Sequence, residues 1–285
     1  MRRHPAAFTE MLRCTLLGQL RNRMALLLAV AFIPVWIAVA RLCASDRPVR
    51  FFLGSLGTDT VSRASQVSQV VNGLAAVTLV TGFVMFMETF KAGETDRRLL
   101  LAGYPRLPML LAKVAAVALI AALLALYTTA VLWASVPVRQ LGPLALGVLG
   151  AGLAYGGIGL LLGSLVRGEL EGFFLVIMLS LVDTGLQNPV FNVVDLTGLE
   201  ILPLYGANQL TLAAAFTSRT PWAHALLSLA WSVAASALAL LVFHLRTRSH
   251  CAVATATATA TGVHAPVTAA GPPEAAVRTA CRRSR

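Results

Sequence analysis

The chain has 285 residues, of which 57% are hydrophobic, and a formal net charge of +11. In a soluble protein this charge would indicate a nucleic-acid binder, but here the positions of the charges along the chain decide their meaning. Apolar segments take up about half of the chain, so no continuous stretch remains that is long enough for a soluble catalytic domain.

Six segments stay apolar for roughly the thickness of a bilayer, which a helix of about 20 residues crosses. Five of them contain no charged residue, and the other is interrupted only by Asp183. In chain order they are residues 24–40, 64–87, 114–138, 140–166, 172–194 and 220–245. The sequence therefore predicts an all-α integral membrane protein in which six transmembrane helices form one domain, residues 24–248.

The segment before the first span, residues 1–23, is predicted to form a cytoplasmic or interfacial helix. Phe8, Leu12 and Leu16 follow one another at helical spacing between arginines, which fits a helix lying in the inner membrane interface. An extension of the first span into the cytoplasm is the alternative. A cleaved signal peptide is less favoured, because 23 residues precede the apolar run.

The basic residues indicate which side each connection faces. Of the 23 lysines and arginines, 17 lie before the first span, between spans two and three, between spans four and five, or after the last span. The positive-inside rule therefore places both termini in the cytoplasm and the protein in the cell membrane. Four arginines between residues 41 and 63 lie on the predicted outer side. Residues 249–285, which begin with alternating Ala and Thr, are predicted to be a disordered cytoplasmic tail.

Several classes of chemistry are excluded by the residues present. The only two lysines, Lys91 and Lys113, are followed by Ala and Val, so the chain holds no P-loop for ATP. No Gly-x-Ser-x-Gly elbow surrounds Ser164, and potential metal ligands do not cluster. The cysteines, which lie too far apart for a disulfide framework, are Cys14, Cys43, Cys251 and Cys281. We therefore expect neither an enzymatic activity nor a cofactor in this chain.

The cytoplasmic segment 88–113 alternates charged and apolar residues. Gly93 and Thr95 predict the start of a short helix parallel to the membrane, which prolines then terminate. Its characteristic residues are Glu94, Asp96, Arg97, Arg98, Leu99, Leu100, Leu101, Gly103, Pro105 and Pro108. Such a helix suits docking into a groove on a soluble partner. A solvated interfacial loop is the alternative.

Small residues and a short apolar segment predict how the helices pack. The fourth span carries two Gly-x-x-x-Gly patterns, which let another helix approach closely either within one subunit or in a homodimer. These residues are Gly152, Gly156, Gly159 and Gly163.

Residues 201–216 are too few for a full span and predict an outer re-entrant or interfacial helix between spans five and six. A plain amphipathic cap over the outer rim is the alternative.

Polar residues inside the spans indicate a candidate substrate pathway. Gln69 and Asn72 share a face of the second span. Asp183 lies 11 residues into the fifth span, about 16 Å deep at about 1.5 Å per residue, where a charge costs on the order of 2.5 to 3.5 kcal/mol. Together with Gln187 and Asn188 it predicts a polar site toward the outer end of this span. The alternative is that the span is short and Asp183 meets outer water.

In combination, these features resemble the permease subunits of ABC-2 type transporters, which are transmembrane subunits of ATP-binding cassette transporters. The likeness lies in the Glu-containing helix, the leucines, the Pro105-Arg106 pair and Lys113 at the start of the third span. It extends to the Gly-rich fourth span, which ends in Leu-Gly-Ser-Leu-Val-Arg, and to the Leu-Pro-Leu-Tyr stretch at 202–205. The resemblance covers residues 6–248.

The resemblance implies that the segment between spans two and three is a coupling helix in contact with a separate ATPase subunit, which holds ATP and magnesium. The coupling residues would be Glu94, Arg97, Arg98, Leu99, Leu100, Pro105, Arg106 and Lys113. The expected function is export of a drug, lipid or other amphiphile by a homodimer, or by a pair with a related permease. An ATP-independent carrier and a membrane scaffold are the alternatives, although no inverted internal repeat is found.

Overall fold

The computed structural model describes residues 3–21, 23–102, 106–190 and 198–261. Its elements are α1 (Arg3–Arg21), α2 (Arg23–Cys43), β1 (Pro48–Leu53), β2 (Thr58–Arg63), α3 (Ala64–Leu101), α4 (Arg106–Ser135), α5 (Leu141–Leu165), α6 (Glu169–Leu186), the 3-10 turn η1 (Leu199–Ile201), α7 (Tyr205–Phe216) and α8 (Trp222–Thr261). The predicted helical architecture is therefore present, with a β-hairpin that the sequence analysis did not foresee.

Four helices are long and apolar enough to cross a membrane: Ala64–Gly93 within α3, Pro108–Ser135 within α4, Leu141–Leu165, which is α5, and Trp222–Val242 within α8. The other two predicted spans correspond to α2 and α6. The described apolar part of α2, Ala29–Cys43, is shorter. α6 ends at Leu186 rather than at residue 194, and it carries three acidic residues within 18. The described chain is thus a helical membrane protein with four candidate spans.

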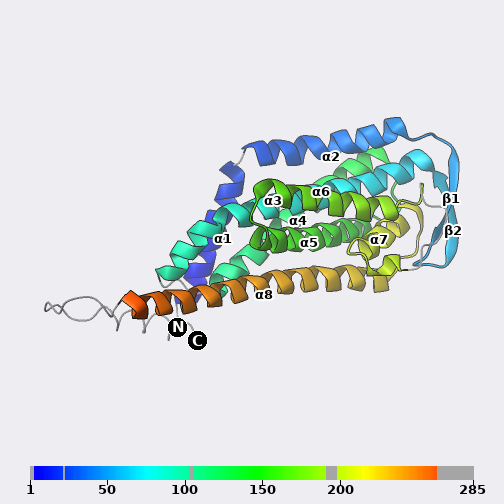
Figure 1. Ribbon diagram of the computed structural model, residues 1–285. Coiled ribbons are helices and arrows are strands. Elements are labelled where there is room, and N and C mark those ends of the chain that lie inside the picture. Colours follow the sequence, from blue (N-terminus) through cyan, green and yellow to red (C-terminus); the bar gives the residue numbers. More distant parts are fainter. Residues whose placement is uncertain (1–2, 22, 103–105, 191–197, 262–285) are drawn as a thin grey trace, which may run out of the picture.

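The long helices run side by side along one axis (Figure 1). The hairpin and α7 lie at one end of this bundle, which we call the hairpin end. The start of α1 and the end of α8 lie toward the opposite end, which we call the terminal end. α1 turns away from the direction of α2 and packs against α4 at the terminal end. The alternative in which α1 simply extends the first span in a straight line is therefore wrong, while its position at the membrane interface stays a prediction.

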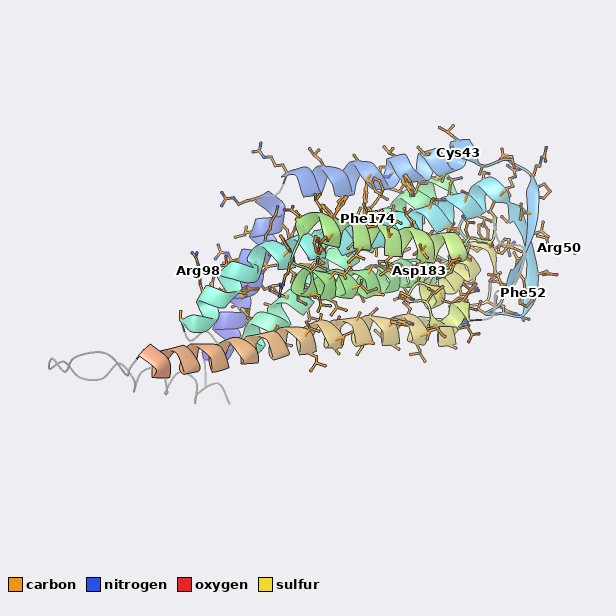
Figure 2. All side chains as sticks on the ribbon, in the orientation of Figure 1. Cys43, Arg50, Phe52, Arg98, Phe174 and Asp183 are labelled. Atoms are coloured by element: carbon orange, nitrogen blue, oxygen red, sulfur yellow. The ribbon has the colours of Figure 1, made fainter. Side chains whose placement is uncertain are left out.

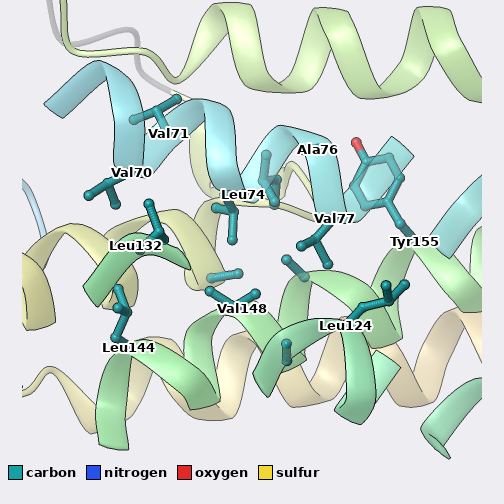
Figure 3. Packing of buried hydrophobic residues seen from close by; sticks show 14 of the residues in the cluster. Val70, Val71, Leu74, Ala76, Val77, Leu124, Leu132, Leu144, Val148 and Tyr155 are labelled. Carbon is teal, nitrogen blue, oxygen red and sulfur yellow. The ribbon is translucent and has the colours of Figure 1, made fainter. Parts of the chain in front are cut away.

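α5 is the centre of the bundle and packs against α3, α4, α7 and α8. Figure 3 shows side chains of α3, α4 and α5 meeting in one apolar cluster; among them are Val70, Val71, Leu74, Val77, Leu124, Leu132, Leu144 and Val148. Because lipid is as apolar as these side chains, close packing rather than exclusion of water holds such helices together. Helix α5 therefore depends on small residues that let its neighbours approach.

The glycines of α5 provide these close approaches within the one subunit. A Cβ placed on Gly156 would lie 2.6 Å from Val117 Cγ1 of α4, and one on Gly163 would lie 2.8 Å from the Phe86 carbonyl oxygen of α3. The same test brings Gly152 against Ala121 of α4 and Gly159 against the Gly82 carbonyl of α3. All four glycines of the Gly-x-x-x-Gly patterns thus face α3 or α4.

The hairpin pairs β1 and β2 in antiparallel register, from Pro48 opposite Arg63 to Leu53 opposite Thr58. Its inner face buries Phe51 and Leu53, and Phe51 meets Phe216 of α7 edge to face, with ring centroids 6.0 Å apart. The hairpin therefore covers the end of the bundle above α7.

The loop of the hairpin also contacts α7. The Ser55 amide donates a hydrogen bond to Gln209 Oε1 at 3.4 Å, and a Cβ on Gly54 would lie 3.1 Å from the Tyr205 hydroxyl. Gly57 closes the loop with φ +60°, a conformation that favours glycine. Helix α7 is in turn mostly buried, whereas an amphipathic cap would expose one face. The cap interpretation is therefore wrong.

α3 is one unbroken helix of 38 residues. A separate short helix starting at Gly93 is therefore not formed, and the expected coupling segment is the C-terminal continuation of α3. A glycine within a helix costs only about 1 kcal/mol relative to alanine, which the hydrogen bonds of the flanking turns outweigh. At the other end of the chain, α8 extends to Thr261, into the segment expected to be a tail; alanine favours the helix there. The rest of that segment lies outside the described residues.

Candidate functional site

A buried polar cluster joins α5, α6 and the start of α7 around Asp183. This residue lies in the last turn of α6, and Figure 2 places it inside the bundle, toward the hairpin end. Its carboxylate accepts hydrogen bonds from the Tyr155 hydroxyl at 2.6 Å, from the Leu204 amide at 3.1 Å and from the side-chain amide of Gln187. Asp183 is 0% exposed, so the alternative in which it meets outer water is wrong.

Further hydrogen bonds strengthen the contacts among these three helices and connect α6 to α3. The Tyr155 hydroxyl also lies 3.3 Å from the Leu179 carbonyl oxygen of α6. The side-chain amide of Asn208 in α7 donates to the Gln187 carbonyl oxygen at 3.0 Å. One turn before Asp183, Ser180 shares a 2.8 Å hydrogen bond with Thr78 of α3. The cluster therefore fixes the end of α6 to α3, α5 and α7.

The remaining predicted pathway residues are not part of this cluster. The Gln69 and Asn72 side chains donate to the Ser65 and Ser68 carbonyl oxygens of their own helix, at 3.1 and 2.9 Å. Asn188 accepts a hydrogen bond from the Val190 amide at 3.0 Å, which caps the turn after α6. Among the described residues, no hydrogen bond links these three to Asp183. The structure thus brings together only Asp183 and Gln187 of the predicted set.

A second polar group lies at the terminal end, where α3 continues past its apolar part. Lys113 of α4 forms an ion pair with Asp96 of α3, and both side chains are almost fully buried. Nearby on α3, Glu88 accepts a hydrogen bond from Gln19 of α1 at 2.9 Å. These contacts fasten the continuation of α3 to α4 and α1.

The predicted coupling residues lie on or next to this continuation. Arg98 is exposed and Leu99 is half-buried, and Figure 2 shows Arg98 at the end opposite to the hairpin. Lys113 is buried. Pro105 lies outside the described residues, as do the side chains of Glu94, Arg97, Leu100 and Arg106.

Four members of the two polar groups were not recognised from the sequence as parts of a site. Tyr155 is one aromatic residue in a glycine-rich span. Leu204 and Asn208 lie in the segment predicted as a re-entrant or interfacial helix, but nothing in its sequence indicates that it packs against Asp183. Asp96 was noted only as a charge near a helix start. One signal was available: a carboxylate inside the membrane needs several buried hydrogen-bond donors, so Asp183 itself indicated that donors from other helices lie around it.

The two polar groups are suited to binding, positioning and charge compensation. No group of three or more His, Cys, Asp or Glu side chains gathers within the described part of the chain. No protein-family model matches the chain, and no curated protein matches it either. Function is therefore inferred from the fold and from these two polar groups.

Proposed function

We propose that the chain is the membrane-spanning permease subunit of an ABC-2 type transporter. In this proposal α2 and α6 cross the membrane together with the four candidate spans, and both termini are cytoplasmic. The terminal end of the bundle then faces the cytoplasm, the hairpin end faces outward, and α7 is a re-entrant helix. A separate ATPase subunit supplies the energy, and the two permease copies alternate between inward-open and outward-open states to export an amphiphile.

The observation that carries the proposal is the continuation of α3 beyond Gly93, where its apolar part ends. A helix that leaves the membrane and stays rigid can transmit the movement of a soluble partner to the membrane-spanning part. The buried ion pair between Asp96 and Lys113 and the Gln19–Glu88 hydrogen bond supply that rigidity. Removing one partner of a buried pair costs about 3–5 kcal/mol, so the continuation moves with α4 rather than independently.

The charge pattern on the same continuation supports a protein partner. Lys91, just before the continuation, and Arg98 on it are exposed while Asp96 is buried. Among these described side chains the acidic one is used inside the fold and the two basic ones remain at the surface. A cationic surface of this kind attracts an acidic groove on a soluble subunit and speeds its association.

Co-purification tests the proposal directly. The full chain, isolated in mild detergent from its native cells, is expected to carry an ATP-binding cassette subunit and ATPase activity. Replacing Arg97 and Arg98 together by alanine, or Glu94 by alanine, is expected to release that subunit. Arg167→Ala is the matched control, because Arg167 is an exposed arginine of the loop between α5 and α6 on the same side. ATP hydrolysis by the chain alone, or labelling of position 94 from the cell exterior, would contradict the proposal.

A further inference from the structure

The surroundings of Asp183 leave its negative charge uncompensated. Within the described part of the chain, the ion pair between Lys113 and Asp96 is the only salt bridge, and it lies at the other end of the bundle. Asp183 also sits in the last turn of α6, where the helix dipole contributes a partial negative charge of its own. A fully buried carboxylate at this position is unfavourable unless a positive charge accompanies it.

The hydrogen bonds to Asp183 do not provide that charge. Its three partners, the Tyr155 hydroxyl, the Leu204 amide and the Gln187 side-chain amide, are neutral and all donate to the carboxylate oxygens. Three donors suit an ionised carboxylate, because a protonated one would offer a donor itself and need an acceptor. The arrangement therefore holds an anion in place without neutralising it.

Near Asp183 in the chain or its hydrogen-bond network, three buried side-chain oxygen atoms have no hydrogen-bond partner among the described residues: Thr184 Oγ1, Gln187 Oε1 and Asn208 Oδ1. Their residues are at least nine-tenths buried. Gln187 and Asn208 are joined to Asp183 by hydrogen bonds, since the Gln187 side-chain amide contacts the carboxylate and the Asn208 side-chain amide contacts the Gln187 main-chain carbonyl. Thr184 directly follows Asp183 in the chain. A buried oxygen without a partner costs about 1–3 kcal/mol, so three on residues tied to one buried carboxylate point to a ligand.

We propose that this cluster binds one Na⁺ ion, coordinated by the Asp183 carboxylate and by the side-chain oxygens of Thr184, Gln187 and Asn208. Oxygen atoms are the ligands that hard cations take, and a single carboxylate matches a single positive charge better than it matches Ca²⁺ or Mg²⁺. The end of a helix that stops inside a membrane protein favours such an ion, because its carbonyl groups point out of the helix. The site does not depend on the proposed transport function.

The test is thermal unfolding of the purified full chain in detergent at constant ionic strength and pH, with NaCl replacing choline chloride. The unfolding midpoint of the wild type is expected to rise by about 3 °C or more as Na⁺ increases to saturation, because an ion that binds only the folded state stabilises it. KCl in the same series is expected to give a smaller rise.

Substitutions test whether the dependence of the unfolding midpoint on Na⁺ arises at the Asp183 cluster. Asp183→Asn is expected to abolish the dependence on Na⁺. Thr184→Val removes only one unpartnered oxygen and is expected to raise the Na⁺ concentration of half-maximal effect about tenfold, without lowering the midpoint in choline chloride. Thr128→Val is the matched control, since Thr128 Oγ1 on α4 is also buried without a partner. Equal midpoints in NaCl and choline chloride, a midpoint that responds to pH alone, or an unchanged Na⁺ response in Thr184→Val would each overturn the proposal.

Discussion

Tyr155 connects two helices through a hydroxyl group in an apolar interior. Its ring belongs to the buried core, while its hydroxyl donates to Asp183 at 2.6 Å. A phenylalanine would fill the same space but would leave one oxygen of a buried carboxylate with a single donor. The contact therefore contributes through its polar atom, and the ring alone cannot replace it.

Tyr155→Phe is expected to destabilise the folded state by about 1.5–3 kcal/mol, the usual value of a hydrogen bond to a charged group. Unfolding of the purified protein in detergent, followed by circular dichroism, measures the effect. Tyr127→Phe is the control, because the Tyr127 hydroxyl donates to the Val30 carbonyl oxygen at 2.8 Å on the exposed surface. If the two variants lost the same free energy of unfolding, the hydrogen bond to Asp183 would contribute no more than one on the exposed surface.

Lys113→Met is expected to destabilise the protein by about 3–5 kcal/mol, because Asp96 then remains buried without its cation. The double variant Lys113→Met with Asp96→Asn is expected to recover most of this loss, since it no longer buries a charge. Yield of monodisperse protein and the unfolding midpoint are the measurements. A double variant no more stable than the single one would mean that packing of the lysine chain, and not charge, is what matters.

At the level of residues, the sequence could indicate Asp183 because one charge interrupts an apolar run. It could also associate Gln187 with Asp183, since residues four apart lie on one face of a helix. It could not supply Tyr155, 28 positions earlier, or Leu204, 21 positions later, because those contacts depend on how α5 and α7 pack. Partners of this kind are set by tertiary structure and leave no local periodicity.

Among the elements, α5 shows how helix spacing is set by glycine. Gly159 of α5 faces the backbone carbonyl of Gly82 in α3, and Gly156 of α5 faces Val117 in α4. Two neighbouring helices therefore approach α5 closely within about one helical turn. A side chain can rotate away from an added methyl group, but a backbone carbonyl inside a helix cannot. The contact of α5 with α3 is therefore the less tolerant of the two.

Gly159→Ala is expected to destabilise the bundle by about 1–3 kcal/mol, because the added methyl group forces α3 and α5 apart. Gly142→Ala is the matched control in the first turn of the same helix, where an added Cβ meets nothing within 4 Å. There the substitution is expected to be neutral or slightly stabilising. Comparing the unfolding midpoints of the two variants checks the expectation, and a neutral Gly159→Ala would contradict this picture of the interface.

At the level of elements, apolar runs predicted the helices well, since each run overlaps one helix of the structure. Their ends were predicted less well, because a single glycine such as Gly93 does not stop a helix whose flanking turns are satisfied. The hairpin was missed because its residues were assessed only for charge. Its signals were present: alternating buried residues around Phe51 and Leu53, and Gly54 and Gly57 bounding the turn.

For the whole molecule, two native cysteines report the proposed orientation. Cys43 lies near the hairpin end in Figure 2, and Cys14 belongs to α1 at the terminal end; both are exposed. A variant retaining only Cys43 is expected to react with a membrane-impermeant maleimide in intact cells. A variant retaining only Cys14 is expected to react only after permeabilisation. The reverse pattern would mean that the orientation is opposite to the proposed one. Labelling of both cysteines in intact cells would contradict the cytoplasmic location of the terminal end.

α3 connects the hairpin end and the terminal end as one unbroken helix. β2 ends at Arg63 and α3 begins at Ala64, so the hairpin is attached directly to the helix whose other end carries Asp96, the partner of Lys113 on α4. The 38 residues of α3 correspond to about 57 Å at about 1.5 Å per residue. If such a rod pivots about one end, a tilt of about 5° moves the other by about 5 Å, a distance comparable to one helical turn. In the proposed topology, leverage of this size would turn a small tilt of α3 at the cytoplasmic end into a sideways displacement of the hairpin at the outer end.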